Sequence, residues 1–243
     1  IYRPNVTGDG GMMTGVPARY QSVEVQQLDR RVPSGYAARM ELRRGDLDTG
    51  TSGRNRIMLK TNEGFAAGWD EWTNYYGMSF KINEPLVLAS GVNKIWSLHQ
   101  KTLLAGEKAS EPGIENTAIA INDATGNLEF SCVAGWQDSP GGSSYVTWRM
   151  IDMGALTTNV WIDVVIKMRL SWDSGVGRLS VWKGVDNAAY ENVIPEIAVA
   201  TTQKNRPNYQ EFGWYRDIEV SPPLPSVITW DQYKVGSSFD AVD

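Results

Sequence analysis

The stretch WSLHQK (96–101) contains His99, the only histidine among 243 residues. Imidazole has an ordinary pKa near ~6.5, so a histidine in an open site can take up a proton close to neutral pH. A lone histidine is more often a packed structural residue, and its function therefore depends on the residues around it. One histidine is too few for an HExxH motif or for any metal centre with several imidazole ligands.

Charged residues, most of them arginines, recur two residues apart in the stretches 39–43 and 52–59. In a β-strand this spacing places side chains on one face. The charged residues spaced in this way are Arg39, Glu41 and Arg43 in the first stretch and Arg54 and Arg56 in the second. If the two strands are neighbours, several guanidinium groups converge on one surface, where planar forks bind carboxylates. A solvated face with Arg–Glu pairs is the alternative.

Two tyrosines share one face of the stretch NYQEFGWYR (208–216). By alternation, that face carries Tyr209, Glu211, Gly213 and Tyr215, and the other face carries Phe212 and Trp214. A glycine between two phenols leaves room for a ligand to approach the strand. Two tyrosines on an ordinary sheet surface are the alternative.

The single cysteine, Cys132, rules out an internal disulfide framework. Its apolar surroundings in LEFSCVAG (128–135) predict a small buried strand residue and not a nucleophile paired with His99. The sequence has no G-x-S-x-G elbow and no G-x-x-x-x-G-K-[ST] loop. A structural calcium ion stays open, because RRGDLDTGTSG (43–53) offers oxygen ligands without EF-hand spacing.

Apolar and polar residues alternate with period two along much of the chain, which is typical of half-buried antiparallel strands. The longest such run is 161–172, whose polar face includes Lys167. The turn DSGVG (173–177) joins this run to RLSVWK (178–183) as a predicted hairpin. The run 227–235 is a predicted terminal strand.

These strands and their turn signals predict one all-β domain over residues 1–243. We expect a two-sheet antiparallel β-sandwich or jelly roll of the concanavalin-like kind. Only KTLLAGEKA (101–109) favours one or two helical turns.

Composition narrows the classes of partner. A formal net charge of −5 argues against a general nucleic-acid binder. No apolar run approaches the ~18 residues of a membrane span, so no membrane partner is expected. The 10 Trp and 10 Tyr suit a core and also the lining of a carbohydrate cleft. The chain begins at Ile1 without a signal-like segment, and we expect a processed, secreted monomer.

Several motifs together resemble a known family. In chain order they are RMELRRGD, GWDEWTNYYGMSFKI, WSLHQ, WIDVVIKMRLSWDSGVGRLSVWKG, YQEFGWYR and WDQYKVGSS. This order resembles the β-jelly-roll polysaccharide lyases of the glucuronan-lyase and heparin-lyase-I-like group, and more distantly the alginate lyases. The resemblance runs from about residue 20 to the C-terminus. It implies two curved sheets, a sugar cleft on the concave sheet, and cleavage of uronic-acid polysaccharides by β-elimination.

The resemblance also implies roles for matching residues. Arg39 matches the arginine of an R-x-E-L-R motif, His99 the cleft histidine, and Tyr209 and Tyr215 the two tyrosines of a Y-x-K-x-G-x-Y motif. The chain departs from these motifs at Ser97, where the family has Gln, and at Glu211, where it has Lys. The candidate catalytic residues are His99, Tyr215 and Arg39, and the candidate substrate-binding residues are Glu41, Arg43, Arg54, Arg56, Gln100, Lys167 and Tyr209. Of these, Gln100 falls on the other side of an ideal strand from His99.

The chemistry needs no cofactor. β-Elimination removes the C5 proton beside a uronate carboxylate and expels the O4 leaving group, and Arg39 would neutralise the carboxylate. In one assignment His99 is the base and Tyr215, a phenol, is the acid. In the other, Tyr215 serves as both and His99 binds the carboxylate.

Two other functions fit the same fold class. A glycoside hydrolase would need a pair of carboxylates at fixed separation, and the E-x-D-x-x-E strand motif is absent. A non-catalytic lectin or carbohydrate-binding module would use Trp and Tyr but would not need His99. The sequence therefore favours a lyase, with an anionic polysaccharide such as glucuronan or alginate as its partner.

Overall fold

The computed structural model describes residues 22–27, 36–42, 55–60, 72–91, 93–100, 115–136, 145–202, 208–216 and 226–243. Within these ranges every regular element is a β-strand. The strands form two antiparallel sheets, which confirms the predicted two-sheet β-sandwich.

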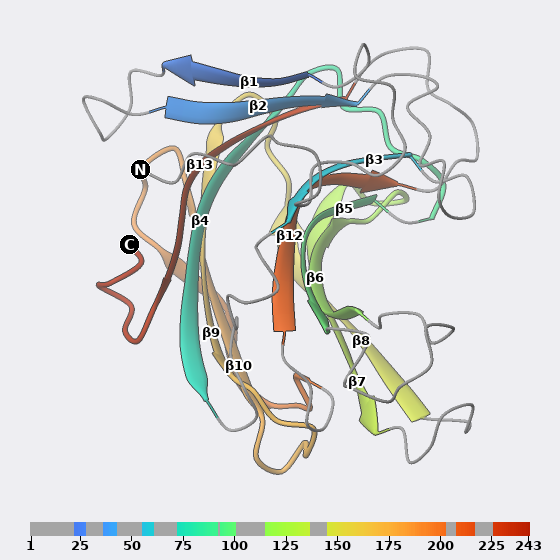
Figure 1. Ribbon diagram of the computed structural model, residues 1–243, viewed down its shortest axis with the longest axis vertical. Helices are drawn as coiled ribbons and strands as arrows, with labels where there is room; N and C mark the ends of the chain where they lie inside the picture. Colours follow the sequence, from blue (N-terminus) through green and yellow to red (C-terminus); the bar gives the residue numbers. More distant parts are fainter. Residues whose placement is uncertain are drawn as a thin grey trace.

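Sheet A has six strands. In spatial order they are β3 (Asn55–Lys60), β12 (Asn208–Arg216), β5 (Asn93–Gln100), β6 (Glu115–Ile121), β7 (Asn127–Trp136) and β8 (Tyr145–Ala155). Figure 1 shows this sheet bending so that the face turned away from sheet B is concave. We call that face the outer face of sheet A.

Sheet B has seven strands. In spatial order they are β1 (Ser22–Gln27), β2 (Tyr36–Leu42), β13 (Ser226–Gly236), β4 (Thr73–Asn83), β9 (Trp161–Arg169), β10 (Arg178–Val185) and β11 (Glu191–Ala198). The long strands β4, β9 and β13 curve along the left of sheet A in Figure 1. The outer face of sheet B is the one turned away from sheet A.

Aromatic rings fill the space between the sheets. The Tyr76 and Trp96 ring centroids, one from each sheet, lie 6.0 Å apart. The ring centroid of Trp230, in sheet B, lies 5.3 Å from that of Phe80 in the same sheet and 5.5 Å from that of Phe212 in sheet A. Such large buried rings typically contribute ~3–5 kcal/mol each. They also identify the inner face of each strand, so the alternate residues must lie on an outer face.

The local strand predictions are largely confirmed. β9 and β10 pair antiparallel around the 173–177 turn, and β13 covers the predicted 227–235 strand. The run from 161 was predicted to continue to Trp172, but β9 ends at Arg169. Beyond Arg169, the Ser171 amide donates to the Thr201 side chain at Oγ1, 3.0 Å away, in place of a neighbouring strand. The stretch 101–109 lies outside the described residues.

After β13 the chain folds back over the outer face of sheet B. Phe239 packs edge-on against Trp182 and Tyr190, with centroid distances of 5.4 and 5.3 Å. Val242 is buried, and its carbonyl oxygen would lie 2.2 Å from a Cβ added at Gly77. Glycine in β4 therefore lets this C-terminal segment approach the sheet closely.

Replacing Gly77 with alanine should destabilise the protein. The added methyl group would overlap the backbone of Val242, and overpacking of this kind costs ~1–3 kcal/mol. Urea denaturation would measure the loss in the free energy of unfolding. Gly175→Ala is the control, because the new Cβ would meet only the Asp173 side chain in an exposed turn. Equal stability of the two variants would contradict this packing.

Candidate active site

Strand β12 runs through the part of sheet A where the candidate residues gather. Trp214 and Arg216 are buried on its inner face, whereas Tyr209, Glu211 and Tyr215 are half-buried on its outer face. The predicted division of this strand into two faces is therefore confirmed. These three residues therefore lie on the side of the sheet that is concave in Figure 1.

Gly213 separates the two tyrosines at an irregular point of the ladder. Its φ is 144°, a conformation that other residues rarely adopt. The pairing of β12 with β5 shifts in register between Phe212 and Tyr215. Such a bulge locally bends a strand and re-aims the side chains beside it. The glycine thus permits the irregular backbone conformation at this point of β12.

His99 lies directly opposite Tyr209 in the pairing of β5 with β12. Residues opposite each other in an antiparallel pair share a face, with Cβ atoms ~4.5–5.5 Å apart. The backbone of His99 is therefore the part of β5 that lies beside Tyr209 in the ladder. Ser97 and Glu211 form the next pair on this face.

Tyr215 lies at the other end of the same face. It is separated from Tyr209 by roughly 20 Å of strand, at ~3.3 Å per residue. A general acid and a general base must both reach the atoms of one bond, within ~3 Å. By register, the phenol nearest His99 is that of Tyr209 and not that of Tyr215.

Two cationic positions flank Tyr215 on the neighbouring strands. Arg56 of β3 lies opposite it on one side, and Lys94 of β5 lies opposite it on the other. The Lys94 Nζ sits 5.2 Å from the centroid of the Tyr215 ring. Lys94 was not among the predicted site residues, because nothing local to residue 94 shows which strand will pair with it.

A third cationic position lies between the two tyrosines. Lys60, the last residue of β3, is opposite Glu211 and hence two residues along β12 from Tyr209. The spacing of strands and residues puts Lys60 closer to Tyr209 than either Arg56 or Lys94. It was not among the predicted site residues.

Small side chains continue the outer face beyond β5. Ser97, Ala118 and Ser131 are opposite one another on β5, β6 and β7, and all are buried. Further along, Glu129 and Asp152 pair on β7 and β8. Each carboxylate accepts a hydrogen bond from an asparagine side chain. Among the described side chains, this face therefore carries Lys94 beside Tyr215 and two carboxylates at β7 and β8.

The predicted place of Arg39 beside His99 and Tyr215 is wrong. Arg39 belongs to β2 of sheet B, between β1 and β13, and its neighbours Met40 and Leu42 fill the core. Arg39 and Glu41 therefore lie on the outer face of sheet B. The Arg39 Nη1 donates to Glu41 Oε2 at 2.8 Å, the Arg–Glu pair that the sequence left open as an alternative.

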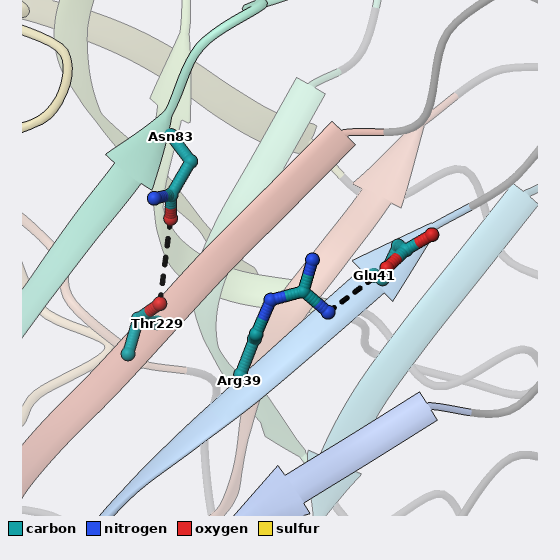
Figure 2. A network of polar contacts seen from close by, with 4 residues as sticks. All are labelled: Arg39, Glu41, Asn83 and Thr229. Atoms are coloured by element: carbon teal, nitrogen blue, oxygen red, sulfur yellow. Dashed lines mark hydrogen bonds and ion pairs between the residues drawn. The ribbon is translucent and has the colours of Figure 1, made fainter. Parts of the chain in front are cut away.

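Figure 2 shows this pair beside Asn83 and Thr229, on the strands of sheet B. The Thr229 hydroxyl donates to Asn83 Oδ1 at 3.4 Å. Arg56, by contrast, lies in sheet A. The two arginine stretches thus belong to different sheets, and the prediction that they share one surface is wrong for Arg39 and Arg56.

The remaining candidates are distributed as follows. Lys167 lies on β9 of sheet B, where its Nζ pairs with Glu196 at 2.8 Å and this hydrogen bond raises the pKa of Lys167. Gln100 lies opposite Asn208 in the pairing of β5 with β12. Arg43 and Arg54 lie outside the described residues.

Other reaction centres find no support in the described ranges. Cys132 is buried in the core, and burial raises the pKa of its thiol to about 12. In the described part of the chain, no three His, Cys, Asp or Glu residues are grouped to hold a metal ion. None of the described residues forms a helix long and apolar enough to cross a membrane.

Comparison with known proteins identifies the family. The family model described as polysaccharide lyase matches residues 9–235. The chain belongs to this family. It is therefore an enzyme, a polysaccharide lyase. No curated protein sequence matches the lyase.

Solved structures agree with this fold. The endo-β-1,4-glucuronan lyase from the fungus Trichoderma reesei superposes with a TM-score of 0.72 at 17% identity, covering 96% of both chains. The alginate lyase vAL-1 from Chlorella virus gives 0.56 at 10% identity, covering 90% of both chains. The catalytic domain of the glycoside hydrolase family 131 protein from Coprinopsis cinerea gives 0.58 at 12% identity, covering 96% of this chain and 84% of the other. These likenesses show the jelly-roll fold and do not by themselves separate lyase from hydrolase chemistry.

The Cys132 thiol should be unreactive in the folded lyase. Its pKa is raised from 9.0 to about 12, so the thiol of the folded protein is neutral at pH 8. Because the thiol of the unfolded chain ionises first, the stability that the buried neutral thiol contributes is lost as the pH rises from 9 toward 12. At pH 8, dithionitrobenzoate should not react with the native protein and should titrate one thiol per chain after unfolding in guanidinium. Rapid reaction of the native protein would contradict this burial.

Proposed function

We propose that this lyase cleaves a uronic-acid polysaccharide by β-elimination on the outer face of sheet A. The observation that carries the proposal is the register of β12, which sets Tyr209 opposite His99 on a concave face that also carries cations. Glucuronan and alginate, the substrates named for the similar solved lyases, are the first polymers to test.

His99 and Tyr209 are the proposed acid–base pair. As a base, His99 would take the C5 proton of the uronate, and Tyr209 would donate a proton to the leaving O4 oxygen. In the second assignment Tyr209 carries out both transfers while His99 binds the carboxylate. Both assignments need the two groups on one sugar, and their positions opposite each other support that arrangement.

Lys60 takes the role that the sequence analysis gave to Arg39. The C5 proton is a weak acid while the neighbouring carboxylate is ionised, because removing it builds further negative charge. A cation near that carboxylate lowers the barrier, and preorganised charges of this kind are usually the largest catalytic term. Lys60 is the cationic position nearest to Tyr209 among those that flank β12.

The carboxylates on β7 and β8 affect which polymers this face would bind. Glu129 and Asp152 would repel a uronate bound over β7 and β8, and their oxygens would accept hydrogen bonds from sugar hydroxyls. A polymer with uronate units near β12 and neutral hydroxyls over β7 fits this charge distribution. We also propose that the enzyme is a secreted monomer that needs no added metal.

An absorbance assay tests the proposed reaction. Elimination leaves a C4–C5 double bond conjugated to the carboxylate, so ultraviolet absorbance should grow as glucuronan or alginate is cut, with or without a chelator. His99→Ala should lower kcat at least ~10²-fold with the fold intact, whereas Arg39→Ala on sheet B should stay near wild type. Reducing ends without absorbance would indicate a hydrolase, and binding without product a carbohydrate-binding module.

A further inference from the structure

The outer face of sheet B carries a group of cations where β9 ends and β10 begins. Lys167 and Arg169 of β9 are half-buried and alternate with buried core residues, so both lie on this outer face. Arg178, the first residue of β10, lies directly opposite Arg169. We call these three residues the sheet B cation cluster. Their face is turned away from sheet A and hence from the candidate active site (Figure 1).

The two arginines of this cluster are poorly neutralised by the fold. Like charges directly opposite each other in an antiparallel pair are destabilising. The Arg178 Nη1 donates to the carbonyl oxygens of Gly175 and Gly177, at 2.8 and 2.7 Å, which fixes its position over the turn. In the part of the chain that the structure describes, no ion pair joins Arg169 to a carboxylate. The pair therefore sets up a local positive potential that an anion would relieve.

One carboxylate on the neighbouring strand offsets part of this charge. Glu196 of β11 accepts a hydrogen bond from Lys167 Nζ at 2.8 Å, and this bond, together with the charge of Arg178, lowers the pKa of Glu196. Three cations thus meet a single carboxylate at these positions of β9, β10 and β11, although the whole protein has a formal net charge of −5. The cluster is a basic patch on an acidic protein.

An exposed tryptophan lies at the same end of sheet B. Trp72 directly precedes β4, and its carbonyl oxygen accepts a hydrogen bond from the Leu170 amide at 2.8 Å. The next residue, Thr73, is opposite Arg169. Trp72 is 54% exposed, more than any other large apolar side chain of the described residues. Flat amphipathic rings pack against sugar rings, and a planar guanidinium binds a carboxylate through two parallel hydrogen bonds.

We propose that the sheet B cation cluster and Trp72 form a second, non-catalytic binding site for an anionic polysaccharide. Arg169 binds the carboxylate of one uronate unit, and Trp72 packs against a sugar ring of the same polymer. A uronic-acid polymer supplies both the ring and the carboxylate. The inference rests on the proposed function for the identity of this polymer. Binding at the second site raises the concentration of polymer near the active site on the opposite face.

Affinity electrophoresis in gels that contain glucuronan or alginate measures this binding. Arg169→Gln should weaken binding by about 10- to 100-fold at low salt, the range for losing a hydrogen bond between charged groups. The matched control is Arg39→Gln, which removes the same charge from the same face, where Arg39 is paired with Glu41. It should bind the polymer as wild type does. Equal binding by the two variants would overturn the second site.

Glu196→Gln tests the site in the opposite direction. Removing the carboxylate that pairs with Lys167 should tighten polymer binding by about two- to fivefold, which corresponds to one exposed ion pair. A purely structural effect would not tighten binding. If thermal unfolding shows that Arg169→Gln does not fold, this variant decides: tighter binding supports the site, and unchanged or weaker binding overturns it.

The methyl ester of the polymer separates the two parts of the site. Trp72→Ala should weaken binding by about fivefold or more on the acid polymer and on its ester alike, because the ring does not depend on the carboxylate charge. Arg169→Gln should weaken binding of the acid polymer and leave binding of the ester unchanged. An equal loss on acid and ester in Arg169→Gln would contradict a carboxylate site.

Turnover of short chains keeps this inference distinct from the proposed reaction. A short uronate oligosaccharide occupies one site at a time, so Arg169→Gln should leave its kcat and KM within about twofold of wild type and raise KM for the polymer. A loss of kcat on the oligosaccharide would contradict the second site. If wild type yields no unsaturated product, the elimination proposal fails, and the comparison of Arg169→Gln with Arg39→Gln in electrophoresis alone supports or overturns the second site.

Discussion

The candidate site depends on the hydrogen-bonded pairing of β12 with β3 and β5. An antiparallel ladder determines which residues lie opposite one another, and a slip of one residue would turn every side chain to the other face. Packing on the inner face of the same strands fixes this register, because Trp214 and Trp96 are buried in the core and a slip would expose them. The chemistry of the outer face is therefore set by packing on the inner one.

This register gives the two tyrosines of one strand different neighbours. Tyr209 is paired with the only histidine in the sequence, whereas Tyr215 is paired with Lys94 beyond the irregularity at Gly213. Acid–base chemistry needs short distances, and polymer binding needs charge spread over several sugar units. In the proposed function, the outer face of sheet A meets both needs.

Local patterns could be predicted from the sequence, and non-local pairing could not. The two faces of β12, the β9–β10 hairpin and the final strand follow from alternation and turn residues within a few positions. The stretch around Arg39 alternates in the same way as the stretch around Arg56, yet β2 joins sheet B and β3 joins sheet A. Neither stretch contains a local signal for the distant strand with which it pairs. Lys94 was missed for the same reason, since its partner Tyr215 is far away along the chain.

Turnover of Tyr209→Phe and Tyr215→Phe tests the account most directly. The two variants remove the same hydroxyl from the same face of the same strand, and both keep the ring. If register assigns the chemistry, Tyr209→Phe loses at least ~10² in kcat on a uronate polymer and Tyr215→Phe keeps kcat within a few fold. Full turnover by Tyr209→Phe together with loss by Tyr215→Phe would contradict the account.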